Sequence, residues 1–191
     1  MELFFTVFAA VFLAEMGDKT QLVTLLMSAC RFPIHVFLGA VTGLALVTAI
    51  GVSLGRIIMS IFPSELTAAA SALLFLAIGG YTIFNHFRLS DEREVDKEVK
   101  CGRNAFAKTF AMIFLAEMGD KTQLTAMSLA AISGRPLLVF GGAMSAQAIN
   151  HGLAALLGGR LLSRLPRRHL RLVSGIVFVL LGIVVLFFNI F

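Results

Sequence analysis

Four carboxylates of this sequence occur in two identical strings of eleven residues, each inside a long apolar stretch. The string Phe-Leu-Ala-Glu-Met-Gly-Asp-Lys-Thr-Gln-Leu occupies residues 12–22 and recurs 102 positions later, at residues 114–124. Its acidic residues are Glu15, Asp18, Glu117 and Asp120. An ionisable side chain in an apolar, membrane-crossing segment is energetically expensive and usually belongs to a substrate or ion pathway. The four acids are therefore the candidate functional residues.

Acids gathered in one place need positive charge, which either protons or a metal cation can supply. Carboxylate oxygens favour hard cations such as Mg²⁺, Ca²⁺ and Mn²⁺. If the two copies meet, four ionised acids carry a charge of −4, and the two motif lysines reduce it to −2, which one divalent cation would cancel. The predicted supporting residues are Lys19, Thr20, Gln21, Lys121, Thr122 and Gln123. Competition between protons and a cation for the same carboxylates is the chemistry of an antiporter.

The composition predicts an all-α integral membrane protein. Of the 191 residues, 58% are hydrophobic and 14% are charged, and the mean hydropathy is +0.91. A soluble domain is about 25% charged. The apolar residues form runs long enough to cross a bilayer, and the basic residues flank these runs. Membrane lipids are therefore the expected surroundings, and nucleic acid is not an expected partner despite the net charge of +5.

Six transmembrane helices fit the sequence, in two inverted three-helix repeats. The expected helices span roughly 3–29, 34–59, 66–88, 105–131, 136–158 and 170–190. The repeat extends beyond the motif, because Phe37, Gly79 and Phe84 match Phe140, Gly182 and Phe187 at an offset of 103. The predicted organisation is a first repeat at 1–88, a charged linker at 89–104 and a second repeat at 105–191. An odd number of helices per repeat inverts the second copy, which is typical of transporters with a site at the membrane midplane.

If the first and fourth helices are continuous, side chains three and four positions apart face the same side. Glu15, Asp18 and Lys19 are then expected on one helical face, as are their counterparts in the second copy. Gly17 and Gly119 lie inside the motif, where a glycine permits either local unwinding or close approach of another helix.

The distribution of basic residues predicts the orientation. The connections after the first, third and fifth expected helices hold eleven basic residues, and the other connections hold only Arg56 and Arg135. The eleven are Arg31, Arg88, Arg93, Lys97, Lys100, Arg103, Arg160, Arg164, Arg167, Arg168 and Arg171. Because positive charge marks the cytoplasmic side, both termini are expected outside and the 89–104 linker in the cytoplasm.

Several polar residues have two interpretations. Gln147, Asn150 and His151, in the fifth expected helix, either line a proton or ion path or form hydrogen bonds between helices. The motif acids and lysines themselves could be interhelical salt bridges, although packing alone does not require the same eleven residues twice. Cys30 and Cys101 form no metal-binding pattern and are expected to be free thiols.

The doubled Glu-x-Gly-Asp-[Lys/Arg]-[Ser/Thr] motif, in two three-helix halves joined by a charged linker, resembles a family of cation/proton exchangers. That family includes bacterial manganese exporters of the MneA type, and Golgi and chloroplast homologues implicated in manganese and calcium homeostasis. The resemblance implies that Glu15, Asp18, Glu117 and Asp120 are cation ligands, with Lys19, Thr20, Lys121 and Thr122 in support. The resemblance also implies export of Mn²⁺, with Ca²⁺ as the alternative ion. The short N-terminus lacks the targeting extension of the organellar members, so a bacterial plasma membrane is the expected location.

The expected function is thus a secondary antiporter that binds no permanent cofactor and moves a divalent cation and H⁺. A cation channel or uniporter is the first alternative, and proton coupling separates the two. An exporter of a small organic solute is another, in which the motif lysines would bind an anion. An enzyme is not expected, because no nucleophile arrangement or HExxH pattern is present. The Gly- and Ala-rich faces leave open packing within one chain or in a homodimer.

Overall fold

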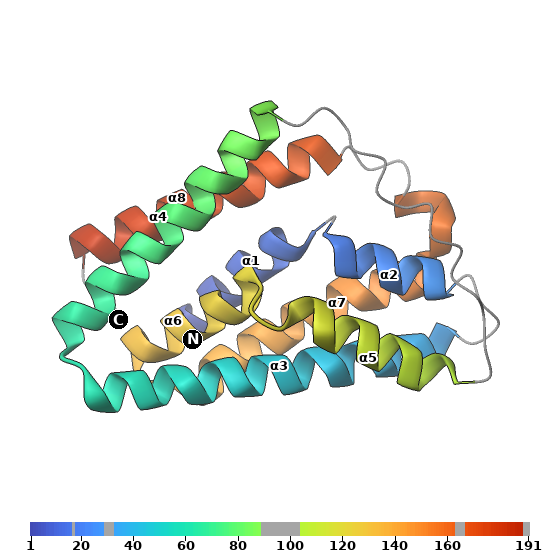
Figure 1. Ribbon diagram of the computed structural model, residues 1–191, viewed down its shortest axis with the longest axis horizontal. Helices are drawn as coiled ribbons and strands as arrows, with labels where there is room; N and C mark the ends of the chain where they lie inside the picture. The colour runs from blue at the N-terminus through green and yellow to red at the C-terminus, as the bar shows by residue number, and fades with distance from the viewer. Residues whose placement is uncertain (17, 29–32, 89–103, 163–166, 189–191) are drawn as a thin grey trace.

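A computed structural model describes residues 1–191 except 17, 29–32, 89–103, 163–166 and 189–191, and α-helix is the regular secondary structure of these residues. Eight α-helices are formed by these residues (Figure 1). They are α1 (Glu2–Glu15), α2 (Lys19–Ser28), α3 (Pro33–Ile61), α4 (Ser64–Arg88), α5 (Ala105–Glu117), α6 (Lys121–Ser133), α7 (Pro136–Leu162) and α8 (Arg167–Phe188). The linker expected at 89–104, apart from Asn104, and both cysteines lie outside the described residues.

The expectation of continuous helices over 3–29 and 105–131 is wrong, because each is broken at the motif. Helix α5 ends at Glu117, Met118 is extended with ψ 112°, and Gly119 has φ 80°. Such a left-handed conformation is strained for residues with a side chain and favours glycine. Helix α1 likewise ends at Glu15, and Met16 is extended with ψ 115°. The side chains after each glutamate therefore do not continue its helical face. The other four expected helices agree with α3, α4, α7 and α8 within a few residues.

The half-helices of each motif pack mainly on the long helix of the opposite half of the sequence. Helices α1 and α2 lie against α7, and α5 and α6 lie against α3, which runs along one edge of the molecule (Figure 1). Both breaks lie near the middle of the molecule's long axis. Helices α4 and α8 form a separate pair, which lies on the opposite side of the molecule from α3 and slants away from it (Figure 1). The fold thus brings the two copies of the motif to the centre.

Glycines permit these helices to approach closely at matching positions of the two halves. A Cβ added to Gly39 of α3 would lie 2.5 Å from the backbone oxygen of Phe106 in α5. One added to Gly142 of α7 would lie 2.8 Å from the backbone oxygen of Phe4 in α1. Gly142 is 103 positions after Gly39, and Phe106 is 102 after Phe4. The same helix–helix contact is therefore made twice, with the roles of the halves exchanged.

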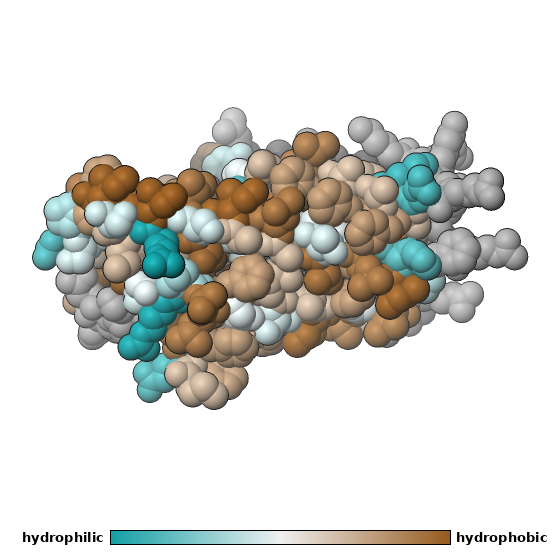
Figure 2. Space-filling view, turned by 90° about the horizontal axis from the view of Figure 1, so that it is seen from below, coloured by the Kyte–Doolittle hydropathy of each residue, from teal (hydrophilic) through white to brown (hydrophobic). Residues whose placement is uncertain are grey.

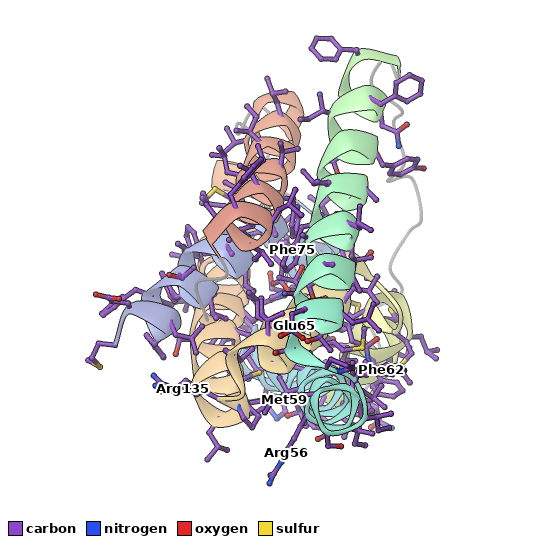
Figure 3. The ribbon with its side chains drawn as sticks, turned by 90° about the vertical axis from the view of Figure 1, so that its left-hand side faces the viewer. Arg56, Met59, Phe62, Glu65, Phe75 and Arg135 are labelled. Atoms are coloured by element: carbon purple, nitrogen blue, oxygen red, sulfur yellow. The ribbon has the colours of Figure 1, made fainter. Side chains whose placement is uncertain are left out.

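The pair of α4 and α8 is held by two stacked aromatic rings. Phe75 and Phe178, 103 positions apart, are fully buried, with their centroids 6.3 Å apart. Figure 3 shows Phe75 between these two helices. A Cβ on Gly79 would lie 2.8 Å from the Gly175 oxygen, and one on Gly182 would lie 3.0 Å from the Ala72 oxygen, so the helices run antiparallel. Burial of the rings and close backbone contact stabilise the pair.

The surface is apolar across the middle of the molecule. In the face shown in Figure 2, hydrophobic residues cover most of the central part, and the hydrophilic ones gather towards the two ends. Large apolar side chains such as Leu115, Leu156 and Leu73 are exposed. Among the described residues, two helical stretches, Pro33–Ile61 and Ser64–Asn85, are long and apolar enough to cross a membrane. Exposed apolar surface of this kind is suited to contact with lipid.

Candidate functional site

The two motif copies form the same local structure around their acids. Glu15 is the last residue of α1, and the backbone N–H of Asp18 donates to its carbonyl oxygen at 3.0 Å. Glu117 is the last residue of α5, and the N–H of Asp120 donates to its carbonyl oxygen at 3.1 Å. Each aspartate then accepts the first backbone hydrogen bond of the next half-helix, from Leu22 or Leu124. The glutamate thus ends one half-helix, and the aspartate begins the other.

The two glutamate side chains are buried in the protein. Glu15 is 1% exposed, and Glu117 is 2% exposed. The two carboxylates are close enough to interact electrostatically with each other, and both also interact with Asp18. Burying carboxylates near one another is unfavourable unless positive charge or protons compensate them. The arrangement is therefore suited to binding positive charge.

Lys121 supplies positive charge at the centre of this group. Its Nζ lies 2.6 Å from Oδ2 of Asp18, so a lysine of the second copy pairs with an acid of the first. The two side chains are 22% and 20% exposed. Lys121 also lies within electrostatic range of Glu15, Glu117 and Asp120. The structure thus brings the four predicted acids around one lysine. The side chain of Lys19, its counterpart, lies outside the described part of the structure.

The acids do not converge on a single point in this conformation. Across the described residues, no group of three or more His, Cys, Asp or Glu side chains is close enough to hold one metal ion. The Lys121 ammonium instead occupies the position beside Asp18. A cation that binds here must therefore compete with an internal ion pair.

Glu15 is held by polar side chains of α7. Gln147 Nε2 donates to Glu15 Oε1 at 2.9 Å, and Gln147 Oε1 in turn accepts from Thr48 Oγ1 at 3.1 Å. The other carboxylate oxygen, Oε2, lies 3.8 Å from His151 Nε2. The second ring nitrogen, His151 Nδ1, is hydrogen-bonded to Thr24 Oγ1 at 2.7 Å. One oxygen of Glu15 is fixed by this network, and the other faces an imidazole.

The motif glutamines tie their half-helices to the opposite long helix. Gln21 Nε2 donates to the backbone oxygen of Asn150 at 3.2 Å, and Gln123 Nε2 donates to that of Val47 at 3.4 Å. Gln123 Oε1 also accepts from the Gly119 N–H at 2.6 Å and so supports the turn. These bonds position the motif between the two halves of the sequence.

Several buried polar atoms at this centre have no hydrogen-bond partner. They are Glu15 Oε2, His151 Nε2, Asn150 Oδ1 and Thr122 Oγ1. Asn150 is also held through its Nδ2, which donates to the Phe12 oxygen at 3.0 Å. Thr20 lies beside the Glu117 carboxylate. Buried polar atoms are nearly always paired, so a cluster of unpaired oxygen and nitrogen atoms indicates a place for a ligand.

Thr24, which is hydrogen-bonded to His151, was not among the predicted residues, whereas Gln147 was predicted with Asn150 and His151 as a possible path residue. Thr24 lies one helical turn after the predicted Thr20, so a search of the same helical face would have found it. Gln147 is a polar residue in an apolar segment, four positions before His151. Its contact with Glu15 joins residues 132 positions apart. The contact therefore follows from the fold and not from local spacing.

A cavity of about 450 Å³ lies at one end of the molecule and contains none of the motif residues. Its lining includes Arg56, Met59 and Arg135, which Figure 3 labels near the junction of α3 and α4 and beside α7. The two arginines that the sequence assigned to one side of the membrane thus line one cavity.

The family model and the similar proteins point to the same family. The model of the family described as "Divalent cation/proton antiporter GDT1" matches residues 3–90 and 105–190. Protein PAM71, chloroplastic, of Arabidopsis thaliana is 30% identical over 95% of this chain and 55% of its own length. GDT1-like protein 3 of the same plant is 24% identical over 91% of the chain and 67% of its own length.

A GDT1-like protein of Synechocystis is 28% identical, over 90% of each chain. The chain thus spans about half the length of the chloroplast relative and nearly all of the Synechocystis one. No solved structure matches.

Proposed function

Because the chain belongs to the GDT1 family of divalent cation/proton antiporters, we propose that it exchanges a divalent cation for protons at the two Glu-Met-Gly-Asp-Lys-Thr copies. The observation that carries this proposal is the gathering of all four motif acids around Lys121, with both glutamates buried. The proposed ligands are Glu15, Asp18, Glu117 and Asp120. Both copies come from one chain, so the site needs no second subunit.

The proposed exchange rests on competition between alternative positive charges. Without the cation, the Lys121 ammonium compensates Asp18, and protons compensate the buried glutamates. An incoming dication would displace Lys121 from Asp18 and require the glutamates to give up their protons. Return of protons to the same carboxylates would then release the cation. Because the cation and the protons cannot be bound at the same time, movement of the cation is coupled to opposite movement of protons.

We further propose six membrane crossings in two inverted repeats. Helix α1 runs parallel to α7, since Phe4 faces Gly142 and Phe12 bonds to Asn150. Helix α3 runs parallel to α5 and α6, because successive glycines of α3 face successive residues of α5 and then of α6. Helix α4 runs antiparallel to α8. Six alternating crossings, with each broken pair counted as one, require these directions. The doubled contacts at an offset of 102 or 103 support the relation between the repeats.

The proposed cation is Mn²⁺, with Ca²⁺ as the alternative, by the family resemblance of the motif. The proposed setting is the plasma membrane of a bacterium, with the termini outside and the linker in the cytoplasm. The shared cavity of Arg56 and Arg135 supports placing these two residues on one side. By the positive-inside rule, the eleven basic residues of the other connections would then lie on the cytoplasmic side.

Transport by purified protein in liposomes tests this function. We expect Mn²⁺ uptake with opposite proton movement in the wild type, and loss of both in Glu15→Gln and Asp120→Asn. Glu65→Gln is a matched control, because Glu65 is an exposed acid in the first turn of α4. Cation flux without proton flux would indicate a channel. Unchanged exchange in both acid variants would place the site elsewhere.

A further inference from the structure

The imidazole of His151 is the most completely buried titratable group of the described residues outside the motif, with no exposed surface. It lies in α7, which carries no motif residue, yet it faces the motif acid Glu15. Its Nε2 and the Oε2 of Glu15 both lack hydrogen-bond partners. Two unpaired, fully buried ligand atoms that face each other are unexpected in a core selected for packing alone.

The separation of these two atoms suits a shared metal ion. At 3.8 Å they are too far apart for a hydrogen bond. Bonds of about 2.0–2.2 Å, typical of small divalent ions with nitrogen or oxygen ligands, allow one ion to reach both atoms. The unpaired Asn150 Oδ1 lies one residue before His151 and adds another oxygen in the same region. Glu117 of the second copy interacts electrostatically with Glu15.

The imidazole is already oriented for this role. Thr24 Oγ1 lies 2.7 Å from Nδ1, so when Nδ1 carries the proton it donates to Thr24, and Nε2 presents a lone pair towards Glu15. Metal-ligating histidines are commonly held in this way through their second nitrogen. Gln147 holds the other Glu15 oxygen, which leaves Oε2 directed at the ring. Thr24 thus positions the His151 ring and its Nε2, and Gln147 positions the Glu15 carboxylate and its Oε2.

The arrangement exists in only one half of the molecule. At the repeat offsets, Thr48 corresponds to His151, and Ala126 corresponds to Thr24. Glu117 therefore has no equivalent imidazole, although its helix break matches that of Glu15. A feature that maintained the fold would be expected in both halves, whereas a ligand for one ion is needed only once.

We infer that His151 Nε2 is a nitrogen ligand of the transported cation and makes the site prefer a transition-metal dication to Ca²⁺ or Mg²⁺. The inference rests on the proposed function and adds to it the determinant of ion choice. Ca²⁺ and Mg²⁺ bind almost exclusively to oxygen, whereas first-row transition-metal ions accept imidazole. The motif acids attract any dication, and His151 discriminates among them.

Pulsed electron paramagnetic resonance of bound Mn²⁺ tests the ligand directly in the wild-type protein. The expected spectrum shows coupling to ¹⁴N that changes to ¹⁵N coupling when histidine is ¹⁵N-labelled. The coupling should be lost in His151→Gln and retained in His35→Gln, a matched change at an exposed histidine of α3. Bound Mn²⁺ without nitrogen coupling would overturn the inference but not the proposed function, provided that Glu15→Gln abolishes binding. Absence of any Mn²⁺ binding would overturn both.

Competition between Mn²⁺ and Ca²⁺ during transport tests whether His151 sets the ion preference. In His151→Gln we expect the Mn²⁺/Ca²⁺ preference to fall at least about ten-fold, mainly through weaker Mn²⁺ transport. His35→Gln should keep the wild-type ratio. An equal loss of both ions in His151→Gln would mean that the residue only maintains the structure, and would contradict the inference.

Discussion

Replacing Lys121 with methionine removes the ion pair that joins the two motif copies. Methionine keeps most of the length and the apolar stem of the side chain but lacks the ammonium. Asp18 would then lose the partner that lies 2.6 Å away, and three further acids would lose a nearby positive charge. We expect the cation-free protein to become less stable.

The size of the stability loss depends on how far the Lys121–Asp18 ion pair is buried. Two unit charges 2.6 Å apart attract each other by on the order of 6 kcal/mol at an effective dielectric constant of about 20. Desolvation offsets most of this attraction: exposed pairs contribute about 0.2–1 kcal/mol, and breaking a buried pair costs about 3–5 kcal/mol. With about one fifth of each side chain exposed, we expect a loss of about 1–3 kcal/mol. For a chain of this size, that corresponds to a fall in Tm of roughly 2–12 °C.

Thermal unfolding in detergent, with and without Mn²⁺, measures this effect. Lys108→Met is the matched control, because Lys108 is exposed on α5. Since a bound dication would compensate Asp18 in place of the lysine, saturating Mn²⁺ should raise the Tm of Lys121→Met more than that of the wild type. If Lys121→Met were as stable as Lys108→Met, or if Mn²⁺ left the difference from wild type unchanged, the competition between lysine and cation would be refuted.

Three further predictions concern packing and the motif turn. Gly39→Ala should destabilise the protein by about 1–3 kcal/mol in thermal unfolding, because the new Cβ meets a backbone oxygen of α5 at 2.5 Å. The same change at Gly80, which has open space, should be neutral or slightly stabilising, and equal effects would contradict the packing. Gln147→Leu should cost about 1.5–3 kcal/mol, since it leaves a Glu15 oxygen without its donor, and wild-type stability would exclude that bond. Gly119→Ala should slow transport and cost about 1–2 kcal/mol through its φ of 80°, and a fully active, equally stable variant would show that the turn is not left-handed.

The sequence was sufficient for the features that depend on local pattern. The long apolar runs predicted helices, and α3, α4, α7 and α8 lie close to their expected spans. The doubled motif identified the acids that the structure gathers around Lys121. Both results follow because periodicity and repeated strings are properties of neighbouring residues.

The helix breaks and the long-range contacts could not be predicted in the same way. The apolar pattern continues through Glu15 and Glu117, so it gave no boundary there, and Gly119 alone fitted either unwinding or close packing. The contact between Thr24 and His151 joins residues 127 positions apart and depends on how α2 lies against α7. The pairing of Lys121 with Asp18, in the other copy rather than its own, likewise required the fold.

Accumulation of Mn²⁺ in proteoliposomes under an imposed pH gradient tests the central proposal most directly. Internal pH and internal Mn²⁺ are recorded together, with and without a protonophore. We expect the proton gradient to drive Mn²⁺ to a higher concentration inside than outside, with protons leaving as Mn²⁺ enters, and we expect the protonophore to abolish the accumulation. Mn²⁺ entry that only equalises the concentrations, at the same rate without a pH gradient, would contradict proton exchange at the four carboxylates.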